Sequence, residues 1–254
     1  MEPLPHTFLF EFMDLPWLPD SLRITVREVL ESCLGEPPRQ YYAWVVNEIL
    51  ELVERHHITT VVELGAGTAP LARRLAKIRS SQPFKIEVSD LYPNVENFKL
   101  LEQEFPGVVR ARYDSVDVSR PFDARPSTLL VFSASFHHLP PQTREAVLGV
   151  LRCHRVAVFE PLRRNFPSVL VACTGFFPGL LAPFYYLKKR PGNARRFFWS
   201  WILPAAPLII VWDGVVSCLR CWHETEWRSR LPTAAGGTES VSIKNSALCQ
   251  MVTW

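Results

Sequence analysis

The residues best suited to bind a ligand lie in a glycine turn near residue 65. An apolar run at residues 61–64 includes Glu63 and leads directly into Gly65 and Gly67. Glycines at such a turn let the backbone approach a ligand closely and adopt dihedral angles that a side chain would forbid. The helix expected after the turn offers amide groups without partners inside the helix. The pattern indicates a site for a nucleotide-like cofactor; a tight strand-to-helix turn without a ligand is the alternative.

Two adjacent histidines, His137 and His138, follow a later apolar segment at residues 128–133. An imidazole titrates near neutral pH, so either residue could take a proton from a hydroxyl or an amine. The alternative is that one of them packs and forms hydrogen bonds within its loop. The pattern leaves both roles open.

Glu160 ends a further apolar segment, residues 155–159. Because the carboxyl ends of parallel strands line one crevice, Glu160 would point to the same place as the histidines. There it would act as a base or anchor a substrate. An ion pair with Arg163 or Arg164 is the alternative.

Apolar segments with the spacing of strands and helices alternate along the chain. Two helices, at residues 20–33 and 39–55, precede the first strand. The alternation predicts an α/β fold with a doubly wound, mostly parallel sheet whose ligand lies at the carboxyl ends of the strands. The expected later helices are residues 71–78, 95–105, 142–151 and 212–230, and the expected later strands are residues 85–89, 108–113, 128–133 and 155–159. Residues 240–244 and 248–254, after a turn at Gly236-Gly237, would form an antiparallel hairpin at the sheet edge.

The segment from Glu63 to Ala69, with the sequence Glu-Leu-Gly-Ala-Gly-Thr-Ala, resembles the first motif of the class I S-adenosylmethionine-dependent methyltransferases, with a small alanine in place of a frequent third glycine. The resemblance extends over residues 61–159 in motif order and implies a Rossmann-like sheet of seven strands. Pro70 stands where a dinucleotide-binding turn would need its third glycine, and a Tyr-x-x-x-Lys pair is missing. Both features disfavour an NAD-dependent oxidoreductase.

The resemblance assigns roles to acidic residues after the second and third strands. In the family, a carboxylate at the end of the second strand accepts hydrogen bonds from both ribose hydroxyls, and Asp90 matches it. A later acidic residue faces the adenine amino group. Asp117 is the better match, and Asp114 is the alternative.

The resemblance also implies that Gly65 and Gly67 lie against the methionine part of S-adenosyl-L-methionine. Glu63 would organise this loop or contact the ammonium group of the cofactor. Residues 133–140 match the position of the fourth motif, and Ser133 at their start is expected to help bind the cofactor. This strand end lies between the transferable methyl group and the acceptor in the family.

An apolar insertion follows Glu160, with uncharged runs at residues 166–187 and 197–212. Prolines and glycines interrupt the first run, and the second is too short to span a bilayer. A spanning hairpin would place the basic loop 188–196 away from the cytoplasm, against the usual preference. We expect a lid that lines a pocket for a hydrophobic acceptor or makes peripheral membrane contact through residues 166–212; burial of its aromatics as ordinary core is the alternative.

Asp213 and Arg220 lie in a stretch that resembles a bacterial-type subgroup of these enzymes. They are spaced one to two helical turns apart. The spacing allows a structural ion pair or a helix-capping role, and it allows a role in binding substrate equally well.

Composition limits the remaining possibilities. The 254 residues, 48% hydrophobic and 21% charged, can bury one full core, and a net charge of +3 is too small for a dedicated nucleic-acid binder. Six scattered cysteines, with one Cys-x-x-Cys spacing and no second pair, indicate reduced thiols and no metal site. Acidic residues and prolines near the N-terminus exclude a secretory signal, so we expect a cytoplasmic protein, with membrane association as a further possibility.

The expected function is methyl transfer to a small, hydrophobic acceptor by direct in-line displacement, for which alignment supplies much of the rate. The rival is a non-catalytic cofactor-binding or membrane-surface interaction protein on the same fold. The expected parts are an N-terminal helical segment (1–57), a cofactor-binding α/β core (58–160), the apolar insertion or lid (161–211), and a C-terminal helix and strands that complete the sheet (212–254).

Overall fold

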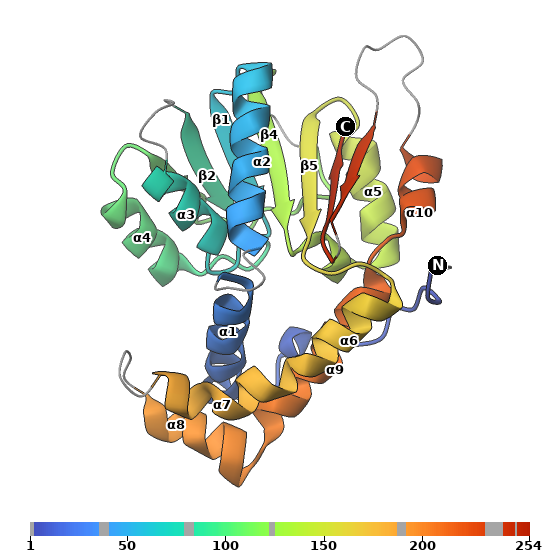
Figure 1. The fold of residues 1–254 in the computed structure, drawn as a ribbon. Helices are drawn as coiled ribbons and strands as arrows, with labels where there is room; N and C mark the ends of the chain where they lie inside the picture. Colours follow the sequence, from blue (N-terminus) through green and yellow to red (C-terminus); the bar gives the residue numbers. More distant parts are fainter. Residues whose placement is uncertain are drawn as a thin grey trace. The chain divides into compact units, whose positions relative to one another are not determined.

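The computed structural model describes residues 3–35, 41–78, 84–121, 125–186, 192–231, 241–246 and 248–254. The chain forms two compact units (Figure 1). Tyr41–Pro161 and His223–Trp254 form the α/β unit, and Met1–Gln40 and Leu162–Trp222 form the helical unit. The predicted turn at residues 236–237 and the first part of the basic loop, residues 188–191, lie outside the described residues.

The α/β unit contains one seven-stranded sheet with the order β3-β2-β1-β4-β5-β7-β6. Strands β1 to β5 run parallel, and β7 is antiparallel to both β5 and β6. The predicted fold class and the predicted edge hairpin are therefore confirmed. The strands are β1 (Thr60–Leu64), β2 (Lys85–Ser89), β3 (Val109–Ala111), β4 (Thr128–Ser133), β5 (Arg155–Glu160), β6 (Ser242–Asn245) and β7 (Gln250–Thr253).

Helices connect these strands (Figure 1). They are α2 (Tyr41–His56), α3 (Pro70–Ile78), α4 (Val95–Glu104), the 3-10 turn η3 (Phe136–His138), α5 (Pro141–Leu151) and α10 (Glu224–Arg230). The central strand β4 is almost continuously apolar and buried, as is typical of a strand covered on both faces. In β2, by contrast, Lys85 and Glu87 alternate with the buried Ile86 and Val88, so one face of that strand is polar.

The connectivity reverses between β1 and β4, which are neighbours at the centre of the sheet. From β1 the chain moves outward through β2 to β3, and from β4 it moves outward in the other direction to β5. Ligands of such sheets bind beyond the carboxyl ends of the strands at this reversal. The segments after Leu64 and Ser133 are therefore the first places to look for a site.

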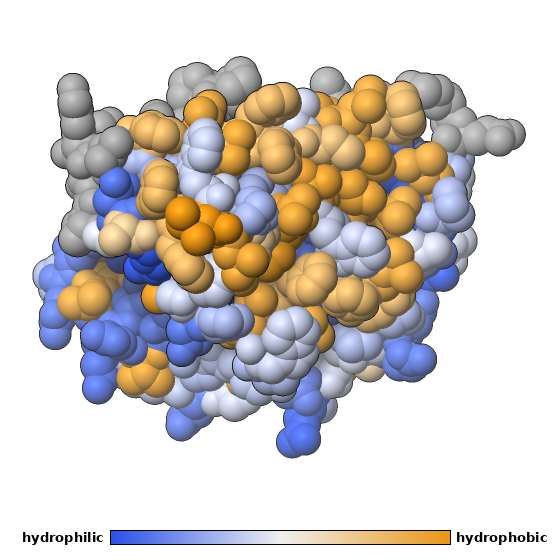
Figure 2. Space-filling model, turned by 90° about the horizontal axis from the view of Figure 1, so that it is seen from below, coloured by the Kyte–Doolittle hydropathy of each residue, from blue (hydrophilic) through white to orange (hydrophobic). Residues whose placement is uncertain are grey.

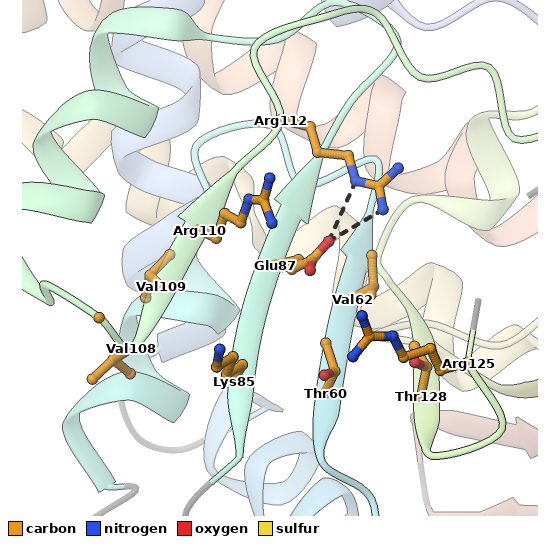
Figure 3. A pocket seen from close by; sticks show the side chains of 11 residues that line it. Thr60, Val62, Lys85, Glu87, Val108, Val109, Arg110, Arg112, Arg125 and Thr128 are labelled. Carbon is orange, nitrogen blue, oxygen red and sulfur yellow. Dashed lines mark hydrogen bonds and ion pairs between the residues drawn. The ribbon is translucent and has the colours of Figure 1, made fainter. Parts of the chain in front are cut away.

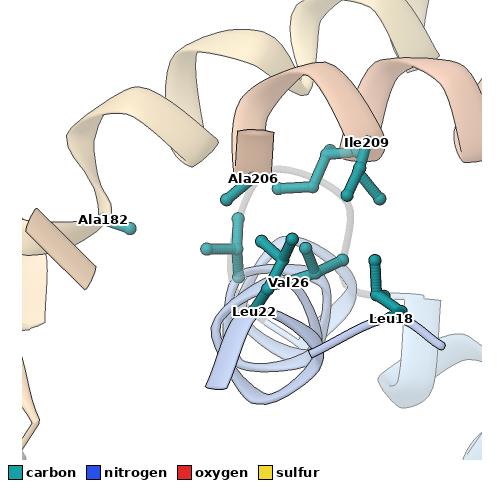
Figure 4. Packing of buried hydrophobic residues seen from close by; sticks show 8 residues of the cluster. Leu18, Leu22, Val26, Ala182, Ala206 and Ile209 are labelled. Carbon is teal, nitrogen blue, oxygen red and sulfur yellow. The ribbon is translucent and has the colours of Figure 1, made fainter. Parts of the chain in front are cut away.

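The helical unit is formed by two parts of the chain that are far apart in the sequence, Met1–Gln40 and Leu162–Trp222. Its core contains Leu18, Leu22 and Val26 together with Ala182, Ala206 and Ile209, as Figure 4 shows. Its helices are η1 (Phe12–Asp14), α1 (Asp20–Gly35), α6 (Phe166–Thr174), α7 (Phe176–Tyr186), α8 (Asn193–Phe197), the π-helical turn η4 (Phe198–Ile202) and α9 (Ala205–Arg220).

Close packing in the helical unit depends on two glycines. A Cβ on Gly179 in α7 would lie 2.7 Å from the backbone of Pro207 in α9, and a Cβ on Gly214 would lie 3.1 Å from Ala172 in α6. Gly179, which interrupts the first apolar run, and Gly214 therefore let α7 and α6 pack closely on α9.

The prediction of one helix over residues 212–230 is wrong. Helix α9 starts earlier, at Ala205, because Pro207 falls in its first turn, where proline is tolerated. It stops at Arg220, since Cys221 and His223 are extended, with ψ of 139° and 160°. A capping box then starts α10, in which His223 N donates to Glu226 Oε2 at 2.8 Å.

Asp213 and Arg220 bind the N-terminal segment. Both carboxylate oxygens of Asp213 accept amide hydrogens, from Phe12 N at 2.8 Å and Met13 N at 3.0 Å. Arg220 donates to Leu9 O at 2.8 Å and lies 3.0 Å from the buried carboxylate of Glu11. Burial raises the pKa of Asp213 to about 7, despite the two amide hydrogen bonds. Both side chains therefore have structural contacts within the helical unit.

Candidate functional site

The glycine turn after β1 touches the segment after β4. Gly65 and Gly67 adopt φ of +65° and +57°. A Cβ on Gly65 would lie 3.2 Å from Ser135 Cβ, and Ser135 Oγ donates to Leu64 O at 3.1 Å. Position 65 thus requires a glycine for two reasons: its φ is positive, and Ser135 approaches its backbone closely.

Glu63 lies beneath this turn and is 3% exposed. Its Oε2 accepts a hydrogen bond from Ala72 N in the first turn of α3 at 3.0 Å. Burial raises the pKa of Glu63 to about 8, the Asp90 carboxylate adds to the shift, and the Ala72 amide opposes it. The side chain therefore ties the end of β1 to the start of α3.

Asp90 lies at the end of β2 and reaches the glycine turn. Its Oδ2 accepts from Gly67 N at 2.8 Å, and its Oδ1 accepts from Tyr92 N at 2.9 Å. A carboxylate has about four acceptor positions, so two remain for hydroxyl groups of a ligand. The structure thus brings Asp90, Gly65 and Gly67 together.

The carboxylate of Asp117 is bonded within its own turn. It accepts from Ser119 Oγ at 2.6 Å and Ser119 N at 3.0 Å, which lowers the pKa of Asp117, and it lies 3.2 Å from Arg120 Nε. The preceding residue, Val116, donates its amide to Asp90 O at 2.9 Å. The loop therefore adjoins the end of β2, and Asp114 is exposed in the same loop.

His137 and Glu160 form a buried pair at the ends of β4 and β5. Nδ1 of His137 lies 2.6 Å from Glu160 Oε2, and the His137 amide donates to Glu160 Oε1 at 3.1 Å. Their side chains are 5% and 4% exposed. A carboxylate oxygen can accept a hydrogen bond from Nδ1 of a histidine, and the tautomer with hydrogen on Nδ1 has its lone pair on Nε2. The pair has the arrangement of a base and the group that orients it.

Arg144 fixes the turn that carries the histidines. Its buried guanidinium donates to His137 O at 2.5 Å and to Leu139 O at 2.8 Å. The ring of His138 lies 4.3 Å from that of His137. Sequence reasoning missed Arg144, although a signal existed: it is a charged residue at helical spacing from the apolar Val147 and Leu148.

Tyr41 is a second residue that sequence reasoning missed. Its hydroxyl donates to Phe159 O at 2.9 Å and lies 3.3 Å from Ser133 Oγ, which places it beside the end of β4. Burial raises the pKa of Tyr41 well above its usual value. Nearby, Ala134 has a left-handed φ of +53°, a strained conformation that is typical of functional strand ends. No pattern in the sequence marked Tyr41, whereas Ala134 lies within residues 133–140, which match the fourth motif.

No family model matches the sequence, and no curated protein matches it. Solved structures do match the fold. The CMeT domain of the citrinin polyketide synthase has a TM-score of 0.54 at 12% identity, with 89% of this chain and 55% of that chain covered. The CurJ carbon methyltransferase has a TM-score of 0.52 at 9% identity, with 88% and 57% covered. An O-methyltransferase family protein from Burkholderia thailandensis has a TM-score of 0.50 at 11% identity, with 89% and 58% covered.

The chain has the class I methyltransferase fold. It spans little more than half the length of these three structures, so the likeness concerns the fold and not their individual activities. Within this methyltransferase fold, the glycine turn, Asp90 and the His137–Glu160 pair all lie at carboxyl ends of strands next to the reversal point.

Proposed function

We propose that the chain is an S-adenosylmethionine-dependent methyltransferase that acts on a small, hydrophobic acceptor. The observation that carries the proposal is the hydrogen bond between Asp90 and the Gly67 amide, which joins the carboxylate expected at a ribose to the expected cofactor turn. A Cβ on Gly67 would meet no heavy atom within 4 Å in the part of the chain that is described, so the turn leaves room beside it. These features fit the cofactor.

The residues have distinct parts in holding S-adenosyl-L-methionine. Asp90 would accept the two ribose hydroxyls with its remaining lone pairs, and the backbone at Gly65 and Gly67 would lie against the methionine part. Glu63 organises the turn from below through Ala72. The loop of Asp117 and Asp114 would contact the adenine amino group. Ser133, at the end of β4, would also contact the cofactor.

When bound, this cofactor supplies a methyl group on a positively charged sulfur. His137 would take the proton of the acceptor hydroxyl or amine through Nε2 as the methyl group passes from sulfur to the acceptor and a neutral thioether is left, and Glu160 would stabilise the resulting imidazolium. His138 is the alternative base. Positioning of the acceptor in line with the methyl group supplies much of the remaining rate.

Calorimetric titration of the purified chain with S-adenosylmethionine and with its demethylated product tests the cofactor assignment. Asp90→Ala should weaken binding at least 100-fold, whereas Glu96→Ala, which removes an exposed carboxylate on α4, should leave it unchanged. Equal binding by the two variants would refute the assignment. Transfer of a labelled methyl group to fractions of a cell extract then distinguishes an enzyme from a non-catalytic cofactor-binding protein.

The hydrophobic nature of the acceptor is supported by the surface of the helical unit. Large apolar side chains are exposed along it, including Phe177 at 62%, Ile202 at 65% and Leu208 at 59% (Figure 2). Single exposed apolar residues are ordinary, but a gathering of this kind marks a surface that binds a hydrophobic molecule, a protein or a membrane.

The same surface supports peripheral contact with a membrane. One group of charged residues in this unit is paired and partly buried: Glu28 binds Arg195 and the buried Arg196, at 2.9 and 2.8 Å. Apolar groups outside and paired charges inside suit an environment of lipid. By length and composition alone, one described helix could cross a membrane, Phe166–Phe184, with a mean hydropathy of 1.5; α8 with η4 and α9 would qualify only as a pair bent by 75°.

A further inference from the structure

A hollow of about 470 Å³ lies on one face of the α/β sheet (Figure 3). Thr60 and Thr128 contribute to it from the first positions of β1 and β4, and Lys85 from the first position of β2. These are the amino ends of the strands, whereas the proposed cofactor site is at the carboxyl ends. We call this feature the basic hollow.

Strand register explains why these side chains share one face. Thr60 is opposite Lys85, and two residues further along Val62 is opposite Glu87, which in turn is opposite Arg110. Side chains two residues apart in a strand point to the same side of the sheet. The described residues between β3 and β4 contain no helix to cover this side, and the polar alternation of β2 fits a face open to water.

The basic hollow has more positive than negative side chains. Arg112 binds Glu87, with Nη2 3.2 Å and Nε 3.3 Å from Oε2. The side chains of Lys85, Arg110 and Arg125 are exposed and make no hydrogen bond or ion pair with any residue that the structure describes. Four cations therefore surround one carboxylate, and three of the four are available to an external anion.

We propose that the basic hollow binds a small anion that carries two or more phosphate groups. Two guanidinium groups offer paired N–H donors that match phosphate oxygens, and three cations exceed what a single phosphate would use. The volume lies within the range of roughly 300 to 1,000 Å³ of small-molecule sites. A nucleic acid is disfavoured because the chain as a whole carries a net charge of only +3.

Calorimetric titration of the full chain with pyrophosphate and with ATP, near 150 mM salt, tests this proposal. Both should bind with millimolar or better affinity that weakens as salt increases, and inorganic phosphate should bind at least tenfold more weakly. The double variant Arg110→Gln/Arg125→Gln should lose at least tenfold in affinity, and Lys85→Gln a smaller factor. The matched control Lys99→Gln/Arg152→Gln removes two exposed charges elsewhere on the α/β unit and should bind as the unchanged chain does.

Three outcomes would overturn the proposal: no binding of either polyphosphate, equal loss in the double variant and its control, or binding of an RNA oligomer without binding of pyrophosphate. Thermal unfolding of each variant verifies that the fold is kept. Binding of S-adenosylmethionine, measured in parallel, should be unchanged in Arg110→Gln/Arg125→Gln, so failure of this proposal and failure of the methyltransferase proposal give different results.

Discussion

The two units of the chain use apolar and charged residues in opposite ways. Of the 23 large hydrophobic side chains that are exposed in the described residues, 17 belong to the helical unit, although the α/β unit is the larger part of the chain. The α/β unit buries its apolar strands and keeps polar groups at its strand ends. The helical unit buries charges such as Arg196 and Arg220 and exposes phenylalanine, leucine and tryptophan.

This contrast separates two uses of a buried charge. In the α/β unit, Glu160 contacts Nδ1 of His137, the residue that we propose as the base. In the helical unit, Arg220 and Asp213 direct their polar atoms to the N-terminal segment, and Glu28 binds two arginines. One buried pair of the α/β unit therefore has a part in the proposed reaction, whereas these buried charges of the helical unit hold the chain together.

Removal of Arg220 should have the largest effect on stability. Arg220→Met removes the guanidinium that lies 3.0 Å from the carboxylate of Glu11, which is 2% exposed, and should destabilise the helical unit by about 3–5 kcal/mol. The control Arg228→Met breaks a half-exposed pair with Glu224 in the α/β unit and should cost about 1 kcal/mol or less. Chemical denaturation measures both, and similar losses would contradict the contrast between the units.

Substitution of His137 should affect rate much more than stability. His137→Gln should lower the rate of methyl transfer by about 10²- to 10⁴-fold while binding of S-adenosylmethionine is retained. The decrease should be smaller for His138→Gln, because Glu160 contacts the ring of His137 and so orients the proposed base. Single-turnover rates and calorimetric binding measure the two effects. A larger loss for His138→Gln would transfer the role of base to that residue.

The two carboxyls with raised pKa values should make stability depend on pH in different ranges. Below its unfolded pKa of 4.5 the contribution of Glu63 is fully present, and it is lost as pH rises toward its folded pKa of about 8, because the folded state holds the proton longer. For Asp213 the corresponding range is 3.8 to about 7. Each group contributes a slope of at most about 1.4 kcal/mol per pH unit.

Denaturation at several pH values tests these ranges. Glu63→Gln, which keeps an oxygen acceptor for Ala72, should flatten the decrease of stability between pH 7 and pH 8. Asp213→Asn should flatten the decrease only below about pH 7. If neither variant changes the slope, the two carboxyls titrate normally in the folded chain.

Substitutions on the apolar surface of the helical unit should change the stability of the fold least. Phe177→Ser/Ile202→Ser alters two side chains that are more than 60% exposed, so stability should change by about 0.5 kcal/mol or less. Flotation with phospholipid vesicles should decrease clearly for this variant. The matched variant Leu91→Ser/Leu100→Ser, on exposed residues of the α/β unit, should float as the unchanged chain does. Equal flotation of the two variants would argue against membrane contact through the helical unit.

Local patterns predicted the alternation of strands and helices and the glycine turn, and the resemblance to methyltransferases pointed to Asp90, which lies beside that turn in the structure. Each depends on residues close in sequence, and parallel strands then bring their carboxyl ends together without further information. Local patterns predict the position of Asp117 but not the partners of its carboxylate. Its position after β3 is as expected, but Ser119 and Arg120 occupy its carboxylate, a competition between nearby partners that spacing does not reveal.

The sequence by itself determined the order of strands and helices and the residues at their ends, because hydrophobic periodicity and glycine chemistry act over a few residues. Only the tertiary structure decided which of those residues meet. The side chains of His137 and Glu160 meet, and so do those of Arg220 and Glu11, although each pair is far apart in the sequence. Packing also brings Arg144 to the backbone carbonyl of His137. The glycine turn was visible in the sequence, whereas the basic hollow exists only because register sets Lys85, Glu87 and Arg110 on one uncovered face.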